Sequence, residues 1–120
     1  MASTSKVEHY RRLNGKYLRE AEELLAKNDY RQASEKFWGA AAEIIKAAAA
    51  KKGITLGTHR SLAEYVEKLQ EEHPELDLAR AFDAAEGLHI NLYEDHLPEA
   101  TLKRRAEAVR EFVKRMEQLL

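Results

Sequence analysis

Apolar residues recur every three or four positions along almost the whole chain, which is the spacing of one face of an α-helix. No segment alternates apolar and polar residues over the length of a strand, so we expect no sheet. The first apolar series predicts a helix that ends near Lys27, before Asn28 and Asp29. Ser5 and Glu8 have the spacing of a capping box at its start.

Two further helices are predicted in the middle of the chain. Asp29 can cap a second helix, whose apolar series continues until Gly53 supplies a left-handed exit. A third, shorter helix follows a brief loop. Thr58 or Ser61 can cap it, and it should end before Pro74.

The last part of the chain predicts two more helices. Asp77 is expected to cap the fourth, and Pro98 suits the first turn of the fifth. Apolar residues of the fifth helix repeat at heptad spacing: Leu102, Ala106, Val109, Val113, Met116 and Leu120. Because the connections are short, neighbouring helices should run up and down. The sequence therefore predicts an all-α fold, an up-and-down bundle of four long helices plus one short helix, in one domain of residues 1–120.

The composition narrows the cellular setting. Lys plus Arg number 20 and Asp plus Glu 21, so no global field draws the chain to nucleic acid or to an anionic membrane. Cysteine is absent, which fits a reducing interior and excludes thiolate chemistry. No apolar run approaches the roughly 20 residues of a membrane span, and the start lacks the apolar core of a signal peptide. We expect a cytoplasmic protein without a membrane partner, with the whole chain as its mature form; the high charge content suits a thermophile.

The segment from His89 to His96 carries the candidate chemistry. Tyr93 follows His89 by four residues and precedes His96 by three, so all three side chains should be neighbours on the inward face of the fourth helix. Asn91 should point away, toward solvent or a partner. A histidine here can act as a general acid or base near neutral pH, and Tyr93 can orient a phosphate. The alternative is that the histidines are hydrogen-bonded structural groups at the edge of the bundle.

A metal site is not expected in this segment. His89 and His96 are two helical turns apart, about 10 Å along the axis, which is too far for one metal ion. The His-Glu-x-x-His pattern of zinc proteases does not occur. We therefore expect neither a metal ion nor a cofactor.

Basic and small residues form three further groups. Two basic groups can contact phosphates, although solvated faces balanced by glutamates are the alternative; they are Arg11, Arg12, Lys16 and Arg19, and Lys103, Arg104 and Arg105. The small residues of 39–50 allow close helix packing or a dimer seam.

Three segments together resemble a known family. They are residues 33–52 with the run Ser-Glu-Lys-Phe-Trp-Gly-Ala-Ala-Ala, then His59, then the string His-Ile-Asn-Leu-Tyr-Glu that starts at His89. In these residues the chain resembles the archaeal PaREP family of the HEPN superfamily, over about residues 16–120. The resemblance implies a HEPN-like helical bundle, often a homodimer. The superfamily includes many RNA-cleaving toxins and partners of minimal nucleotidyltransferases.

The resemblance also bears on catalysis. The ribonuclease motif of the superfamily is an arginine followed, after four to six residues, by a histidine. His96 matches the histidine, but the positions seven, six and five residues before it hold His89, Ile90 and Asn91. An arginine there would stabilise the phosphate charge that builds up during strand cleavage. Asn91 can position a phosphate but cannot neutralise it.

Three functions follow from these observations. The first is a non-catalytic module, of toxin-antitoxin type, that binds nucleotide, RNA or a protein partner through His89, Asn91, Tyr93 and His96. The second is a metal-independent ribonuclease with His96 as general base. The third is a structural scaffold that dimerises through the alanine-rich helix or the heptad face. The expected partners are a second copy of the chain, a nucleotide, an RNA or a nucleotidyltransferase.

Overall fold

The computed structural model describes residues 4–120, which form five α-helices and one 3-10 turn and contain no strand. The all-α prediction is therefore confirmed for this part of the chain. In order, the elements are α1 (Thr4–Ala26), α2 (Tyr30–Lys51), α3 (His59–Glu72), η1 (Pro74–Leu76), α4 (Leu78–Glu94) and α5 (Glu99–Glu117). None of the helices in residues 4–120 is long and apolar enough to cross a membrane.

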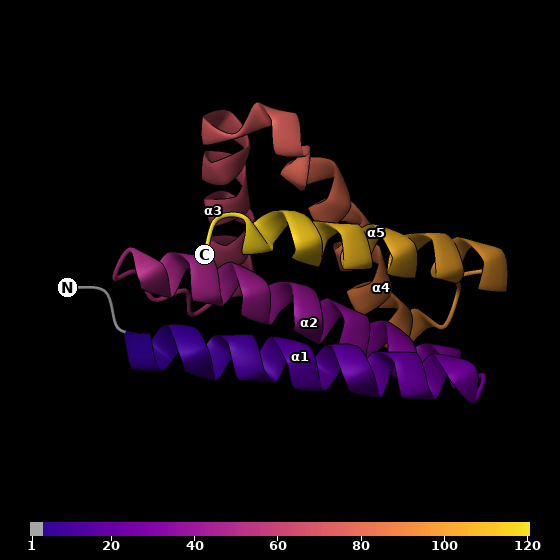
Figure 1. The fold of residues 1–120 in the computed structure, drawn as a ribbon. Coiled ribbons are helices and arrows are strands. Elements are labelled where there is room, and N and C mark those ends of the chain that lie inside the picture. The colour runs from indigo at the N-terminus through magenta and orange to yellow at the C-terminus, as the bar shows by residue number, and fades with distance from the viewer. Residues whose placement is uncertain (1–3) are drawn as a thin grey trace.

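The arrangement departs from a simple up-and-down bundle. Helices α1 and α2 form a long antiparallel hairpin, and α5 lies along α2 on the other side (Figure 1). After α2 the chain turns back, so that helix α3 rises steeply from beside α2, and α4 descends from the far end of α3 back to the bundle (Figure 1). The unpredicted 3-10 turn η1 joins α3 to α4. The steep α3 brings its first residue, His59, against the middle of α2.

Most predicted helix ends are confirmed. Asn28 has a left-handed backbone with φ 62°, and the Asp29 carboxylate accepts a bond from the Gln32 N–H at 3.3 Å. Gly53, with φ 75°, ends the turn after α2. Thr58 caps α3 through a reciprocal capping box with Ser61.

Two predicted caps are wrong. Helix α1 already includes Thr4, so Ser5 lies inside the helix rather than at its cap. Asp77 does precede α4, but its φ is 50° and its side chain caps no N–H of the helix. The reason is η1: the Asp77 N–H closes this turn on the Pro74 carbonyl, and the carboxylate pairs with Arg80 instead.

The alanine-rich face of α2 packs inside the chain. Close packing against α1 is visible at Gly39, where an added Cβ would lie 3.1 Å from the Tyr17 ring. The heptad residues of α5 from Leu102 to Met116 are buried as well. The buried alanines of α2 are Ala33, Ala40, Ala41, Ala42, Ala47, Ala48, Ala49 and Ala50. The two surfaces proposed for a dimerisation scaffold are therefore covered by helices of the same chain.

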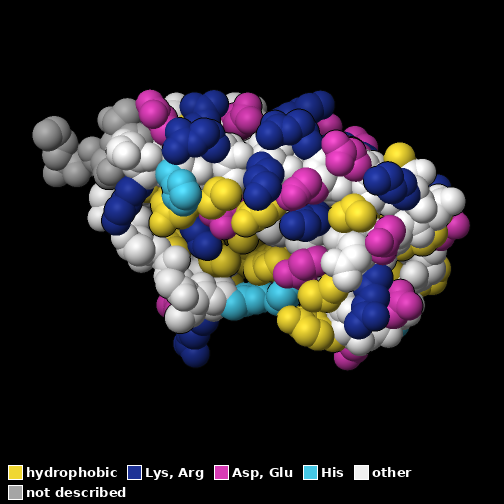
Figure 2. Space-filling model, turned by 90° about the horizontal axis from the view of Figure 1, so that it is seen from below, with side chains coloured by type: hydrophobic (Ala, Val, Ile, Leu, Met, Phe, Trp, Pro, Cys, Tyr) yellow, Lys and Arg dark blue, Asp and Glu magenta, His cyan; other side chains and the backbone are white. Residues whose placement is uncertain are grey.

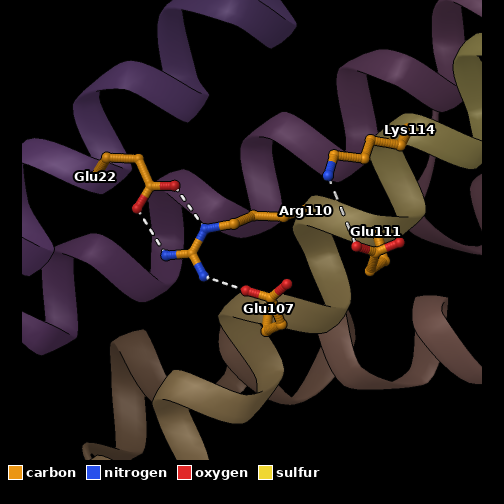
Figure 3. A network of polar contacts seen from close by, with 5 residues as sticks. All are labelled: Glu22, Glu107, Arg110, Glu111 and Lys114. Carbon is orange, nitrogen blue, oxygen red and sulfur yellow. Dashed lines mark hydrogen bonds and ion pairs between the residues drawn. The ribbon is translucent and has the colours of Figure 1, made fainter.

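Arg110 ties the last helix to the first. Its guanidinium donates to the two carboxylate oxygens of Glu22 at 2.6 and 2.7 Å and to Glu107 at 2.8 Å (Figure 3). It also lies over the Phe37 ring, 5.4 Å from the centroid. The hydrogen bonds to Glu22 raise the pKa of the Arg110 guanidinium. Because Glu22 belongs to α1 and Phe37 to α2, this one side chain joins three helices.

We expect a double-mutant cycle between Arg110→Ala and Glu22→Gln to give a coupling free energy of about 1 kcal/mol, because the pair is bidentate and partly shielded from water. Urea unfolding of the four proteins measures it. The exposed Glu111 and Lys114 pair, 3.8 Å apart on α5, is the control and should show almost none. Equal coupling in both pairs would contradict the role given to Arg110.

Candidate functional site

The centre of the site is Trp38, a residue of α2 that is only 8% exposed. The His59 ring stacks on it at 4.8 Å between centroids, and the His89 ring does so at 4.9 Å. The two imidazole centroids are 5.7 Å apart. Rings on opposite faces of the indole would be separated by nearly the sum of the two stacking distances. Both imidazoles therefore lie on the same face of Trp38.

A glutamate holds each imidazole. His59 Nε2 lies 2.6 Å from the Glu86 carboxylate, and His89 Nδ1 lies 3.0 Å from that of Glu35. A carboxylate bound to one ring nitrogen fixes the orientation of the ring. The second nitrogen of each ring has no hydrogen-bond partner among the described residues. The side chains are 44% and 27% exposed, so these nitrogens are open to a ligand.

The two histidines line a hollow of about 240 Å³ between α2, the loop before α3, and α4. We call this hollow the histidine cleft; its lining residues are Trp38, Ala42, Lys46, Leu56, Gly57, Thr58, His59, Leu62 and His89. None of the lining residues is acidic, since Glu35 and Glu86 are not among them. Figure 2 shows two adjacent histidine side chains beside hydrophobic ones on this face of the molecule.

The amino end of α3 opens into the histidine cleft. Its capping box uses the N–H of Ser61, and the Leu62 N–H bonds to the Thr58 carbonyl. The backbone N–H groups of His59 and Arg60 have no acceptor within the described part of the chain. Free N–H groups at the start of a helix favour an anion. The cleft is therefore suited to a negatively charged group.

A larger hollow of about 610 Å³ lies elsewhere, at the carboxyl ends of α2 and α3. Lys51, Lys52 and Lys68 line it. The carbonyl groups of helix ends favour cations, and Lys51 Nζ donates to the Leu119 carbonyl at 3.3 Å. Lys68 Nζ lies over the Tyr65 ring, 5.9 Å from its centroid. Since Lys51 and Lys68 are engaged by the protein itself, we place the candidate site in the histidine cleft.

Of the residues predicted from the sequence, His89 lies in the cleft. His96 does not share a helix face with His89, as had been predicted. Helix α4 ends at Glu94, and Asp95 turns the chain with φ 46°. His96 lies in the loop that follows, with its ring 3.6 Å from the Glu94 carboxylate. Tyr93 is an edge-on neighbour of His89 at 6.0 Å, yet it is 71% exposed rather than inward. The predicted three-residue face is wrong because the helix ends before His96.

Asn91 was expected at the surface but is only 1% exposed. Its side-chain oxygen accepts the N–H groups of His96 and Leu97, at 2.8 and 2.9 Å. Its amide nitrogen donates to Ser34 Oγ at 3.1 Å. The loop after α4 needs an acceptor for its backbone donors, and Asn91 provides it from inside. Asn91 is thus a positioning residue for the loop that carries His96.

Four residues of this site were not predicted as site residues: Trp38, His59, Glu35 and Glu86. The family resemblance includes His59 and the run with Glu35 and Trp38, but it gave them no role. The four residues belong to three different helices, so no single periodic pattern contains them. One local signal was present. A glutamate precedes an aromatic ring by three residues twice, as Glu35 before Trp38 and as Glu86 before His89.

The basic group of α5 is engaged by the protein itself. Arg105 donates to the carbonyls of Asp83 and Ala84 across Gly87, where an added Cβ would collide with the guanidinium. Lys103 Nζ lies 2.7 Å from Glu99. Lys103, and after it a hydrogen bond from Tyr30, lowers the pKa of Glu99. The same contact with Glu99 raises the pKa of the Tyr30 phenol.

The basic group of α1 is more open. Arg11, Arg12, Lys16 and Arg19 line a shallow hollow of about 530 Å³ on the outer side of this helix. Acidic side chains of α1 lie beside it, and Figure 2 shows both signs of charge interspersed on this face. The group is a mixed, solvated surface rather than a continuous basic track.

Comparison with known proteins establishes the family. Residues 9–113 match the archaeal PaREP1/PaREP8 family. This chain belongs to that family. Among curated proteins, none matches the chain. A crystal structure of a protein from Sulfolobus solfataricus has the same fold, with a TM-score of 0.78 and 27% identity over 88% of this chain and 94% of the other.

We expect Asn91→Ala to lower the free energy of unfolding by roughly 2 kcal/mol, because two loop N–H groups and the Ser34 hydroxyl lose a buried partner. Denaturant unfolding of the purified protein measures this. Tyr93→Ala, two residues away but exposed, should change it by less than about 0.5 kcal/mol. If the two variants were equally stable, the positioning role of Asn91 would be wrong.

Proposed function

We propose that this PaREP protein is a single HEPN-like domain, residues 1–120, that binds a nucleotide or RNA in the histidine cleft without cleaving it. One observation supports this most: two imidazoles, held on Trp38 by carboxylates, line the same small hollow, and the second nitrogen of each ring has no partner among the described residues.

A phosphate fits the charges of the cleft. The side chain of Lys46 lines the cleft, with its Nζ 6.0 Å from the centroid of the Tyr10 ring of α1, and the amino end of α3 supplies free N–H groups. Glu43 lies 3.4 Å from Lys46 Nζ and partly balances its charge, but it does not line the cleft. Attraction therefore depends on direct hydrogen bonds, from the N–H groups of α3 and from protonated imidazoles, rather than on a strong net field.

Tyr93 gives the rest of a nucleotide a place to bind. Its exposed ring lies 6.0 Å from the His89 ring, beside the cleft. Bases stack on exposed aromatic rings without regard to sequence, with a gain of roughly 1–3 kcal/mol per base. In this proposal His89 contacts the phosphate, Tyr93 contacts the base or sugar, and Asn91 holds the loop with His96 next to them.

A metal-independent ribonuclease is the second candidate, and the histidine pair favours it. One imidazole of a pair can take a proton from an attacking hydroxyl while the other gives one to the leaving oxygen. His59 and His89 have this proximity, whereas His96, the general base expected from the sequence, lies in an exposed loop. The sequence motif still lacks the arginine that would stabilise the charge of the reacting phosphate.

A homodimer and a nucleotidyltransferase partner stay predictions of the sequence analysis. Ile90 and Tyr93 are exposed apolar side chains one helical turn apart on α4, which supports a protein contact beside the cleft. Sedimentation equilibrium of the purified chain decides between monomer and dimer; a monomer at all concentrations would remove the homodimer.

We expect a short fluorescent oligoribonucleotide to bind the protein in an anisotropy titration, and Lys46→Met to weaken binding about tenfold, the value of one charge-assisted hydrogen bond. Lys114→Met, which removes an exposed lysine of α5 that does not line the cleft, is the matched control and should change affinity less than about twofold. No binding by the wild-type chain would refute the proposal.

The same samples, run on a denaturing gel without metal ions, test the second candidate. Intact RNA supports the binding module. Cleavage that is lost in both His59→Gln and His89→Gln, while their thermal unfolding stays cooperative, would replace it with the ribonuclease.

A further inference from the structure

We infer that the histidine cleft recognises a terminal phosphate monoester, such as the 5′ end of an RNA or a mononucleotide, rather than the diesters inside a strand. The inference rests on the proposed function and specifies its ligand. It follows from the shape of the cleft, from its supply of cations and from its hydrogen-bond donors.

The cleft is closed on its inner side. Trp38, Ala42 and Leu62 form this wall, and all three are buried in the core. Its volume of about 240 Å³ lies below the roughly 300–1,000 Å³ of cavities that enclose whole ligands. A diester carries a nucleoside on each side of its phosphorus and needs two exits. A monoester carries one and can enter the hollow with its phosphate first, against this wall.

The supply of cations also argues against a strand. Proteins that follow a diester backbone do so along extended positively charged grooves. The cleft offers a single lysine, Lys46, which is itself paired with Glu43. Behind the imidazoles stand Glu35 and Glu86, whose charges weaken any long-range attraction. A continuous backbone would therefore gain little by running through this site.

The donors of the cleft are instead concentrated at one point. They are the unpaired N–H groups at the start of α3 and, when the imidazoles are protonated, the second ring nitrogens of His59 and His89; the Lys46 side chain also lines the hollow. A terminal phosphate presents three non-bridging oxygens and about −1.5 to −2 charges near neutral pH, against two oxygens and a single charge for a diester. The larger charge and the third oxygen match this number of donors.

The test compares two oligoribonucleotides of the same sequence, one with a 5′-phosphate and one with a 5′-hydroxyl, each labelled at the 3′ end. Anisotropy titrations with the full chain measure both affinities. We expect the 5′-phosphorylated RNA to bind at least about tenfold more tightly, the effect of one or more charge-assisted hydrogen bonds. His59→Gln and Lys46→Met should each reduce this preference, and Lys114→Met should retain it. Circular dichroism melts of the variants confirm that they are folded.

Each outcome decides a separate point. Equal affinities for the two RNAs would overturn the inference and leave RNA binding intact, whereas no binding of either RNA would overturn both proposals. A preference that survives in both His59→Gln and Lys46→Met would place the phosphate outside the cleft and also overturn the inference.

Competition with ribose 5-phosphate separates the two sources of the monoester. Displacement of the RNA indicates that a free sugar phosphate suffices, and a retained 5′ preference without displacement assigns the ligand to the RNA end.

Discussion

The stacking of two imidazoles on one indole face determines how three helices of this protein meet. Trp38 lies in the middle of α2, His59 is the first residue of α3, and His89 lies in α4. Since the His59 ring stacks on Trp38, α3 starts beside the middle of α2, and it leaves α2 at a steep angle (Figure 1). The other side of α2 carries small residues instead of large rings, and these let α1 pack closely along the length of α2. One helix thus combines a tight structural face with an aromatic, polar one.

The aromatic side of α2 continues as a polar seam toward α4. Glu35 holds His89, and the neighbouring Ser34 holds Asn91, so two successive residues of α2 pair with two residues of α4. Burying polar groups is costly unless they are hydrogen-bonded, and here each polar group named has a partner. These hydrogen bonds fix the register between α2 and α4 and also orient the His89 ring. In the proposed function, the same hydrogen bonds that stabilise the contact of α2 with α4 point the free nitrogen of His89 at the ligand.

The sequence was sufficient for the helices because their signals are local. Periodic apolar residues, Asp29 and Thr58 as caps, and Gly53 as an exit all act within a few residues. The end of α4 was missed because no glycine stands between Tyr93 and Pro98, and because Asp95 takes a left-handed conformation that few side chains adopt. Pro98 disfavours a helical conformation at Leu97, the residue before it. This was a sign in the sequence that α4 ends close to His96.

The histidine cleft could not be predicted from local sequence patterns. His59 and His89 are 30 residues apart in the sequence, and each pairs with a glutamate of another helix. Asn91 is buried because it bonds to the loop after α4. Since that loop was predicted to be helix, Asn91 was wrongly predicted to face solvent. The family resemblance gave the helical class correctly, and residues 9–113 confirm the PaREP membership. Neither could show that Trp38 is the common platform of the two histidines.

Trp38 is the only tryptophan in the chain, so all indole fluorescence of the protein comes from the histidine cleft. The most direct measurement is its emission during a titration with the 5′-phosphorylated RNA, excited at the red edge of indole absorption, where RNA does not absorb. We predict a saturable change in Trp38 emission with the same midpoint as the anisotropy curve, because the ligand contacts the two rings stacked on the indole. RNA that binds by anisotropy while the emission of Trp38 stays constant would place the ligand elsewhere and contradict the account.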